Sequence, residues 1–85
     1  MTNLAIKNNL RRLRFDAGEI TQAKLAQKVG VTRQTIVALE TRQYLPSLEL
    51  AMKLAAAFGC DLNELFYWEN MDAARTKYDL TSKNT

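Results

Sequence analysis

Arginine and glutamine stand side by side at Arg33 and Gln34, and the small apolar residues Val37 and Ala38 follow about one helical turn later. Each of these residue types can read the edge of a DNA base pair. Arginine can bond guanine through two parallel hydrogen bonds, glutamine can do the same with adenine, and a small apolar side chain can contact the methyl group of thymine. A helix with these residues on its outer side would be suited to contacting bases in the major groove.

The sequence around these residues predicts two short helices joined by a tight turn. Thr21 and Thr32 are suitable N-caps, and Gly30 can adopt the left-handed conformation that ends a helix. The predicted helices therefore cover residues 22–29 and about 33–41.

The predicted helices also have the residues that a steep crossing requires. Ala26 is small at the expected point of closest approach, and the buried contacts are expected from Leu25, Val29, Val31, Ile36 and Leu39. Because Ile36 and Leu39 point inward, the opposite side of the second helix needs no core residue.

The rest of the chain predicts an all-α fold, a compact five-helix domain over residues 1–68. Of the other predicted helices, the first ends near Ala17. The next is capped by Ser47 and ends at Gly59, and the last begins after an Asp61 cap. Residues 4–6 and 66–68 are expected to pair as a small antiparallel ribbon. Residues 69–85 are polar without an apolar period, which predicts a partly mobile tail.

Composition argues against several classes of function. The 85 residues include no histidine and one cysteine, Cys60, so we expect no metal site, no cofactor and no base-activated nucleophile. We therefore expect that the protein is not an enzyme, and no small-molecule ligand is evident. No run approaches the roughly 20 apolar residues of a membrane span, and we expect a cytoplasmic protein. A net charge of +3 does not by itself indicate DNA binding.

The segment from Thr21 to Glu40 resembles the phage-repressor and Cro-like (Xre-type) helix-turn-helix family. The resemblance continues through residues 44–51 and 62–66, covers residues 10–68, and is greatest to short, single-domain bacterial or phage regulators of transcription. It implies binding to double-stranded DNA, with Arg33, Gln34, Val37 and Ala38 at base-contacting positions. It also implies backbone contacts from Gln22, Thr32, Thr41, Arg42, Gln43 and Tyr44, and an inward-facing ion pair between Arg14 and Glu40.

A homodimer that represses transcription from an inverted-repeat operator is the function expected from this resemblance, because one helix contacts too few base pairs for useful specificity. The candidates for the dimer interface are the apolar residues Leu65, Phe66, Tyr67 and Trp68. Alternatively, these residues cover the core of the monomer. The alternative function is that of an antitoxin-like protein, which binds a partner protein and autoregulates its own promoter.

Overall fold

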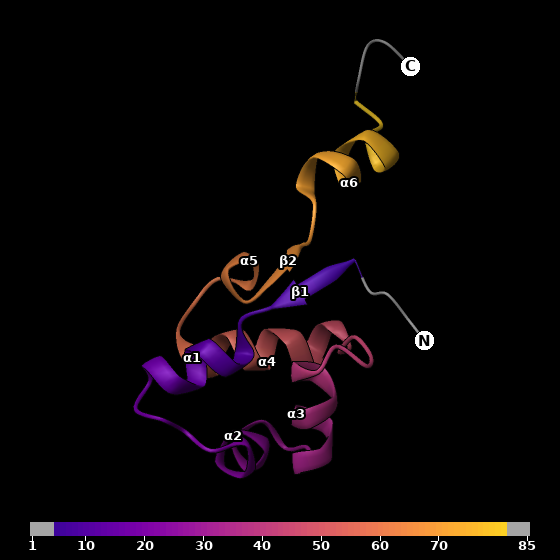
Figure 1. The fold of residues 1–85 in the computed structure, drawn as a ribbon. Coiled ribbons are helices and arrows are strands. Elements are labelled where there is room, and N and C mark those ends of the chain that lie inside the picture. Colours follow the sequence, from indigo (N-terminus) through magenta and orange to yellow (C-terminus); the bar gives the residue numbers. More distant parts are fainter. Residues whose placement is uncertain (1–4, 82–85) are drawn as a thin grey trace.

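The computed structural model describes residues 5–81, which form six helices and a two-stranded antiparallel sheet (Figure 1). The elements are, in chain order, β1 (Ile6–Asn8), α1 (Leu10–Asp16), α2 (Gln22–Val29), α3 (Arg33–Glu40), α4 (Leu48–Phe58), α5 (Leu62–Leu65), β2 (Phe66–Trp68) and α6 (Met71–Tyr78). The predicted helical fold and its small antiparallel ribbon are thus confirmed, with one additional helix, α6, that the sequence does not predict.

Hydroxyl side chains fix the starts of α2, α3 and α4. The side-chain oxygens of Thr21, Thr32 and Ser47 each accept a hydrogen bond from the backbone N–H three residues later, at 3.0, 3.2 and 3.1 Å. Gly30 ends α2 in the left-handed conformation, with a φ of 78°. These local signals explain why the sequence predicts the bounds of α2 correctly.

The cap of α2 is open to a direct test. Replacing Thr21 with alanine removes the acceptor for one backbone N–H of α2, and we expect a loss of about 1 kcal/mol in the free energy of unfolding. Urea denaturation followed by circular dichroism measures this loss. Thr21→Ser, which keeps the hydroxyl group, serves as the control and should lose much less.

The core lies where α1, α2, α3, α4 and α5 meet. Its fully buried members are one residue from α1, two from α3, and one each from α4 and α5, namely Leu10, Ile36, Leu39, Leu54 and Leu65. Cys60 packs against this cluster. Burial raises the pKa of the Cys60 thiol, and the nearby carboxylates of Glu64 and Asp61 raise it further. The thiol therefore remains protonated at neutral pH and acts as a packing residue.

The first strand of the ribbon lies two residues further along the chain than the sequence predicts, whereas the second strand, residues 66–68, lies at the predicted place. β1 is Ile6–Asn8 and not residues 4–6, and it pairs with β2 so that Ile6 lies opposite Trp68. Leu4, part of the predicted strand, lies outside the described residues. Asn8 explains the shift, because its side-chain amide donates to the carbonyl of Leu39 at 2.9 Å while its side-chain oxygen accepts from the N–H of Leu10 at 3.1 Å. β1 therefore runs almost directly into α1.

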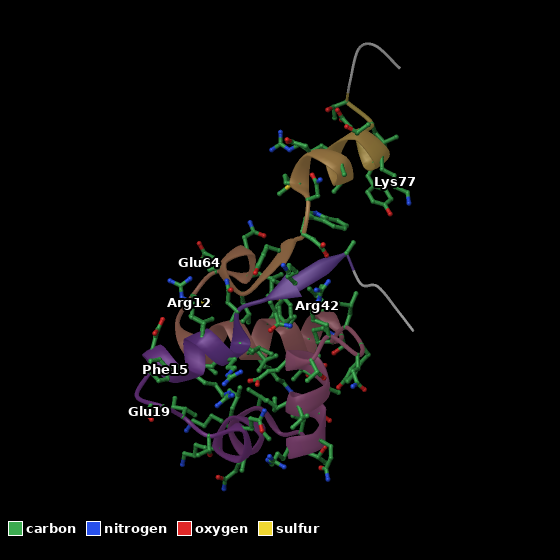
Figure 2. All side chains as sticks on the ribbon, viewed as in Figure 1. Arg12, Phe15, Glu19, Arg42, Glu64 and Lys77 are labelled. Atoms are coloured by element: carbon green, nitrogen blue, oxygen red, sulfur yellow. The ribbon has the colours of Figure 1, made fainter. Side chains whose placement is uncertain are left out.

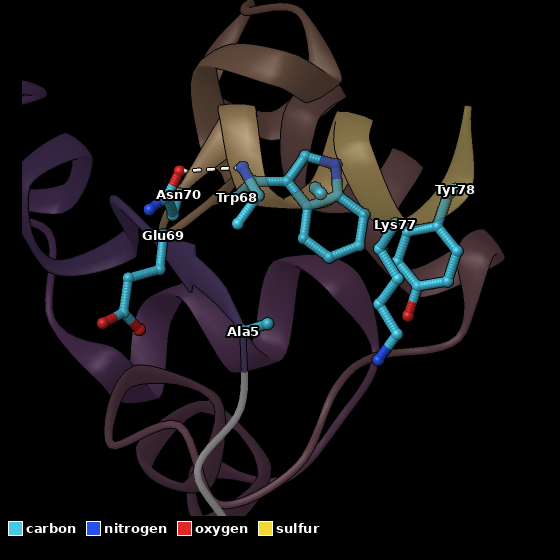
Figure 3. Close-up of a pocket in the computed structure, with 8 residues that line it drawn as sticks. Ala5, Trp68, Glu69, Asn70, Lys77 and Tyr78 are labelled. Carbon is cyan, nitrogen blue, oxygen red and sulfur yellow. Dashed lines mark hydrogen bonds between the residues drawn. The ribbon is translucent and has the colours of Figure 1, made fainter. Parts of the chain in front are cut away.

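A helix, α6, forms in the segment that the sequence predicts to be a tail. The side chain of Asn70 accepts a hydrogen bond from the backbone of α6 at 3.0 Å. The rings of Trp68 and Tyr78 stack with centroids 5.9 Å apart, and the Lys77 ammonium lies 5.5 Å from the Tyr78 centroid (Figure 3). No residue of α6 is buried. It lies at the opposite end of the molecule from α2 and α3 (Figure 1).

Candidate nucleic-acid interface

A short turn at Gly30 joins α2 and α3 at a steep angle. In Figure 1, α2 is seen nearly end-on, whereas α3 runs along the plane of the picture. Ala26 is only 3% exposed between the packed helices, and its carbonyl accepts the backbone N–H of Val31 at 3.0 Å. A larger side chain at Ala26 would push the two helices apart, so the crossing depends on this residue.

The two sides of α3 have different surroundings. Ile36 and Leu39 are 0% and 1% exposed and hold one side of the helix in the core. Arg33 and Gln34 are exposed at the N-terminal end of α3, while Val37 and Ala38 are half-buried. The structure therefore leaves Arg33 and Gln34 exposed, while Val37 and Ala38 are partly covered on the same helix.

A single carboxylate, that of Glu40, connects α1, α2 and α3. Arg14 donates to it from Nε and Nη2, at 2.7 and 3.0 Å, and Gln22 donates from Nε2 at 3.0 Å. The side chains of Arg14 and Glu40 are only 15% and 7% exposed. Such a two-pronged, charge-assisted contact fixes orientation as well as distance. It therefore fixes α3 relative to the two helices before it.

The long turn between α1 and α2 also contacts Arg14. Glu19 has a φ of 59°, and the chain then brings the carbonyl of Ile20 to 2.8 Å from Nη1 of Arg14. The turn therefore supplies a further acceptor for the guanidinium group of Arg14, beside the carboxylate of Glu40.

Gln22 can serve both the protein and a ligand, because its amide nitrogen has two hydrogens and only one points to Glu40. The side chain lies at a depression of about 550 Å³ between α1, α2 and α3. Three arginines, Arg11, Arg14 and Arg33, line this depression together with Glu40, Thr21 and Thr41. Arg14 is paired with Glu40, whereas the exposed guanidinium groups of Arg11 and Arg33 and the remaining amide hydrogen of Gln22 make the depression suitable for the phosphate groups of nucleic acid.

The loop after α3 contains four residues that the sequence predicts to contact the DNA backbone, and their surroundings differ. The hydroxyl of Thr41 donates to the carbonyl of Val37 at 2.8 Å, so its hydrogen is already used. Arg42 forms an ion pair with Glu69 at 3.2 Å and lies beside the ribbon (Figure 2). Gln43 and Tyr44 are exposed. Arg42 is therefore directed toward the two-stranded sheet of β1 and β2 and not toward the outer side of α3.

Sequence reasoning did not predict the contact between Arg42 and Glu69, because the two residues are separated by 27 positions and no local pattern relates them. The sequence alone also does not assign Arg11 to the site, since an exposed arginine on a helix is usually an ordinary surface charge. Its position at the depression beside Gln22 and Arg33 follows only from how α1 packs on the other helices.

The predicted interface residues, at the end of α5 and in β2, are mostly used within the monomer. Leu65 is 0% exposed and is therefore not available to a partner, which corrects the prediction. Phe66 packs against the core cluster, and Trp68 stacks on Tyr78. Tyr67 is 38% exposed. The alternative, that this segment covers the core of the monomer, describes Leu65 and Phe66 better.

Comparison with known proteins identifies the class of fold. A family model described as helix-turn-helix matches residues 10–65, which include α1 to α5. The chain belongs to this helix-turn-helix family of transcriptional regulators. A crystal structure of a candidate DNA-binding protein from Bacteroides fragilis is similar in fold, with a TM-score of 0.65 and 23% identity, over 72% of this chain and 97% of that one.

Individual relatives share more of the sequence. An HTH-type transcriptional regulator from Methanocaldococcus jannaschii is 45% identical over 65 residues, which span 76% of this chain and 97% of that protein. One from Bacillus subtilis is 44% identical over 64 residues, or 75% of this chain and 96% of that protein. These relatives are named as regulators of transcription and not as enzymes, as the sequence analysis predicts.

Within residues 5–81, no helix has the length and apolar character needed to cross a membrane.

Proposed function

We propose that this protein is a sequence-specific regulator that binds double-stranded DNA as a homodimer, places α3 in the major groove, and represses transcription from an inverted-repeat operator in the cytoplasm. The observation that carries the proposal is the position of Arg33 and Gln34. Both are exposed at the start of a helix whose other side is fixed by the core and by the bonds to Glu40.

Within this proposal, the four outer residues of α3 contact the bases. Arg33 and Gln34 form hydrogen bonds with base edges, and Val37 and Ala38 contact thymine methyl groups. Arg33 is long enough to pair with guanine through two bonds, which would determine one position of each half-site. The half-buried position of Val37 and Ala38 suits short apolar contacts at the base of the groove.

Contacts with the DNA backbone are proposed on either side of α3. Gln22 and Thr32 stand at the starts of α2 and α3, and Gln43 and Tyr44 are exposed in the loop that follows α3. Arg11 is included because it lines the depression beside Gln22. Such contacts position a protein on the duplex without reading its sequence.

Selection of binding sites from random double-stranded DNA tests the proposal. We expect enrichment of an inverted repeat with half-sites about one helical turn, roughly 10 base pairs, apart. Recovery of a single half-site would support base reading by a monomer and contradict the dimer. If no sequence is enriched while binding to all DNA is retained, sequence-specific regulation is ruled out.

Gln22→Ala should weaken binding to every DNA sequence by a similar factor of about tenfold, because the phosphate contact that it removes carries no sequence information. Fluorescence anisotropy on the selected operator and on a scrambled duplex measures both affinities. Gln27→Ala, on the same helix at an exposed position outside the depression, is the matched control. A loss confined to the operator would contradict the assignment of Gln22 to the backbone.

A second candidate function is favoured by α6, which lies outside the segment matched by the family model and has no buried residue. An antitoxin-like protein would use such a helix to hold a partner protein while α2 and α3 bind its own promoter. Deletion of residues 69–85 separates the two functions. A regulator without such a partner should keep its operator affinity and lose no bound protein in a pull-down from its host, whereas an antitoxin should lose its partner.

A further inference from the structure

The outer side of α4 exposes an apolar row that the monomer does not cover. Leu48 and Met52 are 67% and 58% exposed, and Ala56 is also exposed one turn further on. They line a shallow hollow along α4, on the flank of the helix beside the buried residues Ala51, Leu54 and Ala55. We call Leu48, Met52 and Ala56 the α4 outer stripe. Soluble proteins seldom leave a contiguous apolar patch open unless it binds a partner.

We infer that the α4 outer stripe is the surface through which two copies of this chain form the dimer, with their α4 helices antiparallel across a two-fold axis. This inference rests on the homodimer in the proposed function. The α4 outer stripe replaces residues 65–68 as the candidate interface, because Leu65 is buried and Phe66 packs on the core of its own monomer.

The charges beside the stripe favour a second copy over other partners. Glu49 and Lys53 flank the stripe and form an exposed ion pair at 3.1 Å, with side-chain exposures of 79% and 53%. In an antiparallel pair of helices, a two-fold axis midway between these residues places Glu49 opposite Lys53 of the partner subunit. The same surface then carries both members of each intermolecular pair, as a two-fold interface requires.

The apolar residues have the same symmetry. An axis midway between Leu48 and Met52 places Leu48 opposite Met52 of the partner subunit. The midpoint between Leu48 and Met52 and the midpoint between Glu49 and Lys53 differ by one residue, or about 1.5 Å along the helix. One two-fold axis can therefore serve the apolar contacts and the charge pairs together. We would not expect a partner of unrelated sequence to match both the apolar contacts and the charge pairs.

This interface also leaves the candidate DNA surface accessible. We expect a second copy bound at the α4 outer stripe to leave Arg33 and Gln34 uncovered, because both lie at the start of another helix, α3, and neither lines the hollow on α4. Two reading helices could then be presented by one dimer, as an inverted repeat requires.

Replacing Met52 with glutamate tests the inference. Sedimentation equilibrium without DNA should show a dimer for the wild type and a dissociation constant at least about 100-fold higher for Met52→Glu, because two carboxylates would enter an apolar interface near the axis. The controls are Tyr67→Glu on the ribbon and Phe15→Glu on α1, both at exposed aromatic residues. Circular dichroism establishes that each variant is folded.

The inference is overturned if folded Met52→Glu dimerises like the wild type, if Tyr67→Glu is the variant that dissociates, or if the wild type is monomeric at all concentrations. These measurements use no DNA. A wild type that dimerises through α4 but selects no operator would therefore reject the proposed function while leaving the interface intact.

Charge exchange tests the symmetry without an apolar substitution. Glu49→Lys and Lys53→Glu should each weaken self-association by several-fold, because each places like charges opposite one another. Mixed in equal amounts, the two variants should prefer the heterodimer, in which both intermolecular pairs have opposite charges. Native mass spectrometry measures the proportions. A statistical mixture of homodimers and heterodimers contradicts the antiparallel pairing.

Discussion

Replacing Glu40 with alanine should lower the free energy of unfolding by about 3 kcal/mol, since the substitution leaves the guanidinium group of Arg14 without its carboxylate partner in a largely buried position. Gln22 loses the same acceptor. For a domain of this size, a loss of this magnitude should lower Tm by more than about 10 °C. Thermal unfolding and urea denaturation, both followed by circular dichroism, measure the effect.

The matched control is Asp16→Ala. Asp16 also forms an ion pair, with Arg12, but its side chain is 58% exposed, and an exposed pair contributes at most about 1 kcal/mol. A second comparison replaces Arg14 and Glu40 together with leucine, which should destabilise the protein less than Glu40→Ala because no buried charge remains unpaired. An unchanged Tm for Glu40→Ala would show that the connection between α1, α2 and α3 does not stabilise the fold.

Arg33→Ala should weaken binding to the selected operator by roughly 30-fold to 10,000-fold. Each bidentate contact with guanine provides about 1 to 3 kcal/mol of discrimination, and a dimer loses two such contacts. The preference at one position of each half-site should relax at the same time. Operator affinities and a repeated site selection with the variant measure the two effects.

Arg12→Ala is the control for this substitution, because Arg12 is an arginine of similar exposure on α1 whose nearest partner is Asp16, at 3.7 Å, and it does not line the depression. It should keep the affinity and the preference of the wild type. Arg33→Lys keeps the charge but cannot form the same two parallel bonds, so it should recover affinity for all DNA and not the base preference. An equal loss on all sequences for Arg33→Ala would contradict base reading.

The helices that carry the candidate interface could be predicted because their signals are local. Thr21, Thr32 and Gly30 determine where α2 and α3 begin and where α2 ends, and each acts within about four residues. The inward positions of Ile36 and Leu39 follow from helical periodicity. The position of Arg33 on the outer side of α3 can then be predicted without further information.

The features that could not be predicted depend on contacts between distant segments. α6 has no apolar period, and its contact with the rest of the protein is the stacking of Tyr78 on Trp68. The bond from Asn8 to the carbonyl of Leu39 determines where β1 lies and joins residues 31 positions apart. Leu65 belongs to the core because α5 turns it inward, whereas an apolar run in the sequence does not distinguish a core residue from an interface residue.

The stacking of Trp68, the last residue of β2, on Tyr78, the last residue of α6, provides an optical probe of this helix. Trp68 is the single tryptophan of the chain, and its ring lies against Tyr78 (Figure 3). Intrinsic tryptophan emission therefore monitors this one junction. A shift of the emission maximum would report detachment of α6 while circular dichroism still shows a folded helical core, so the two ends of the molecule can be followed separately without any added label.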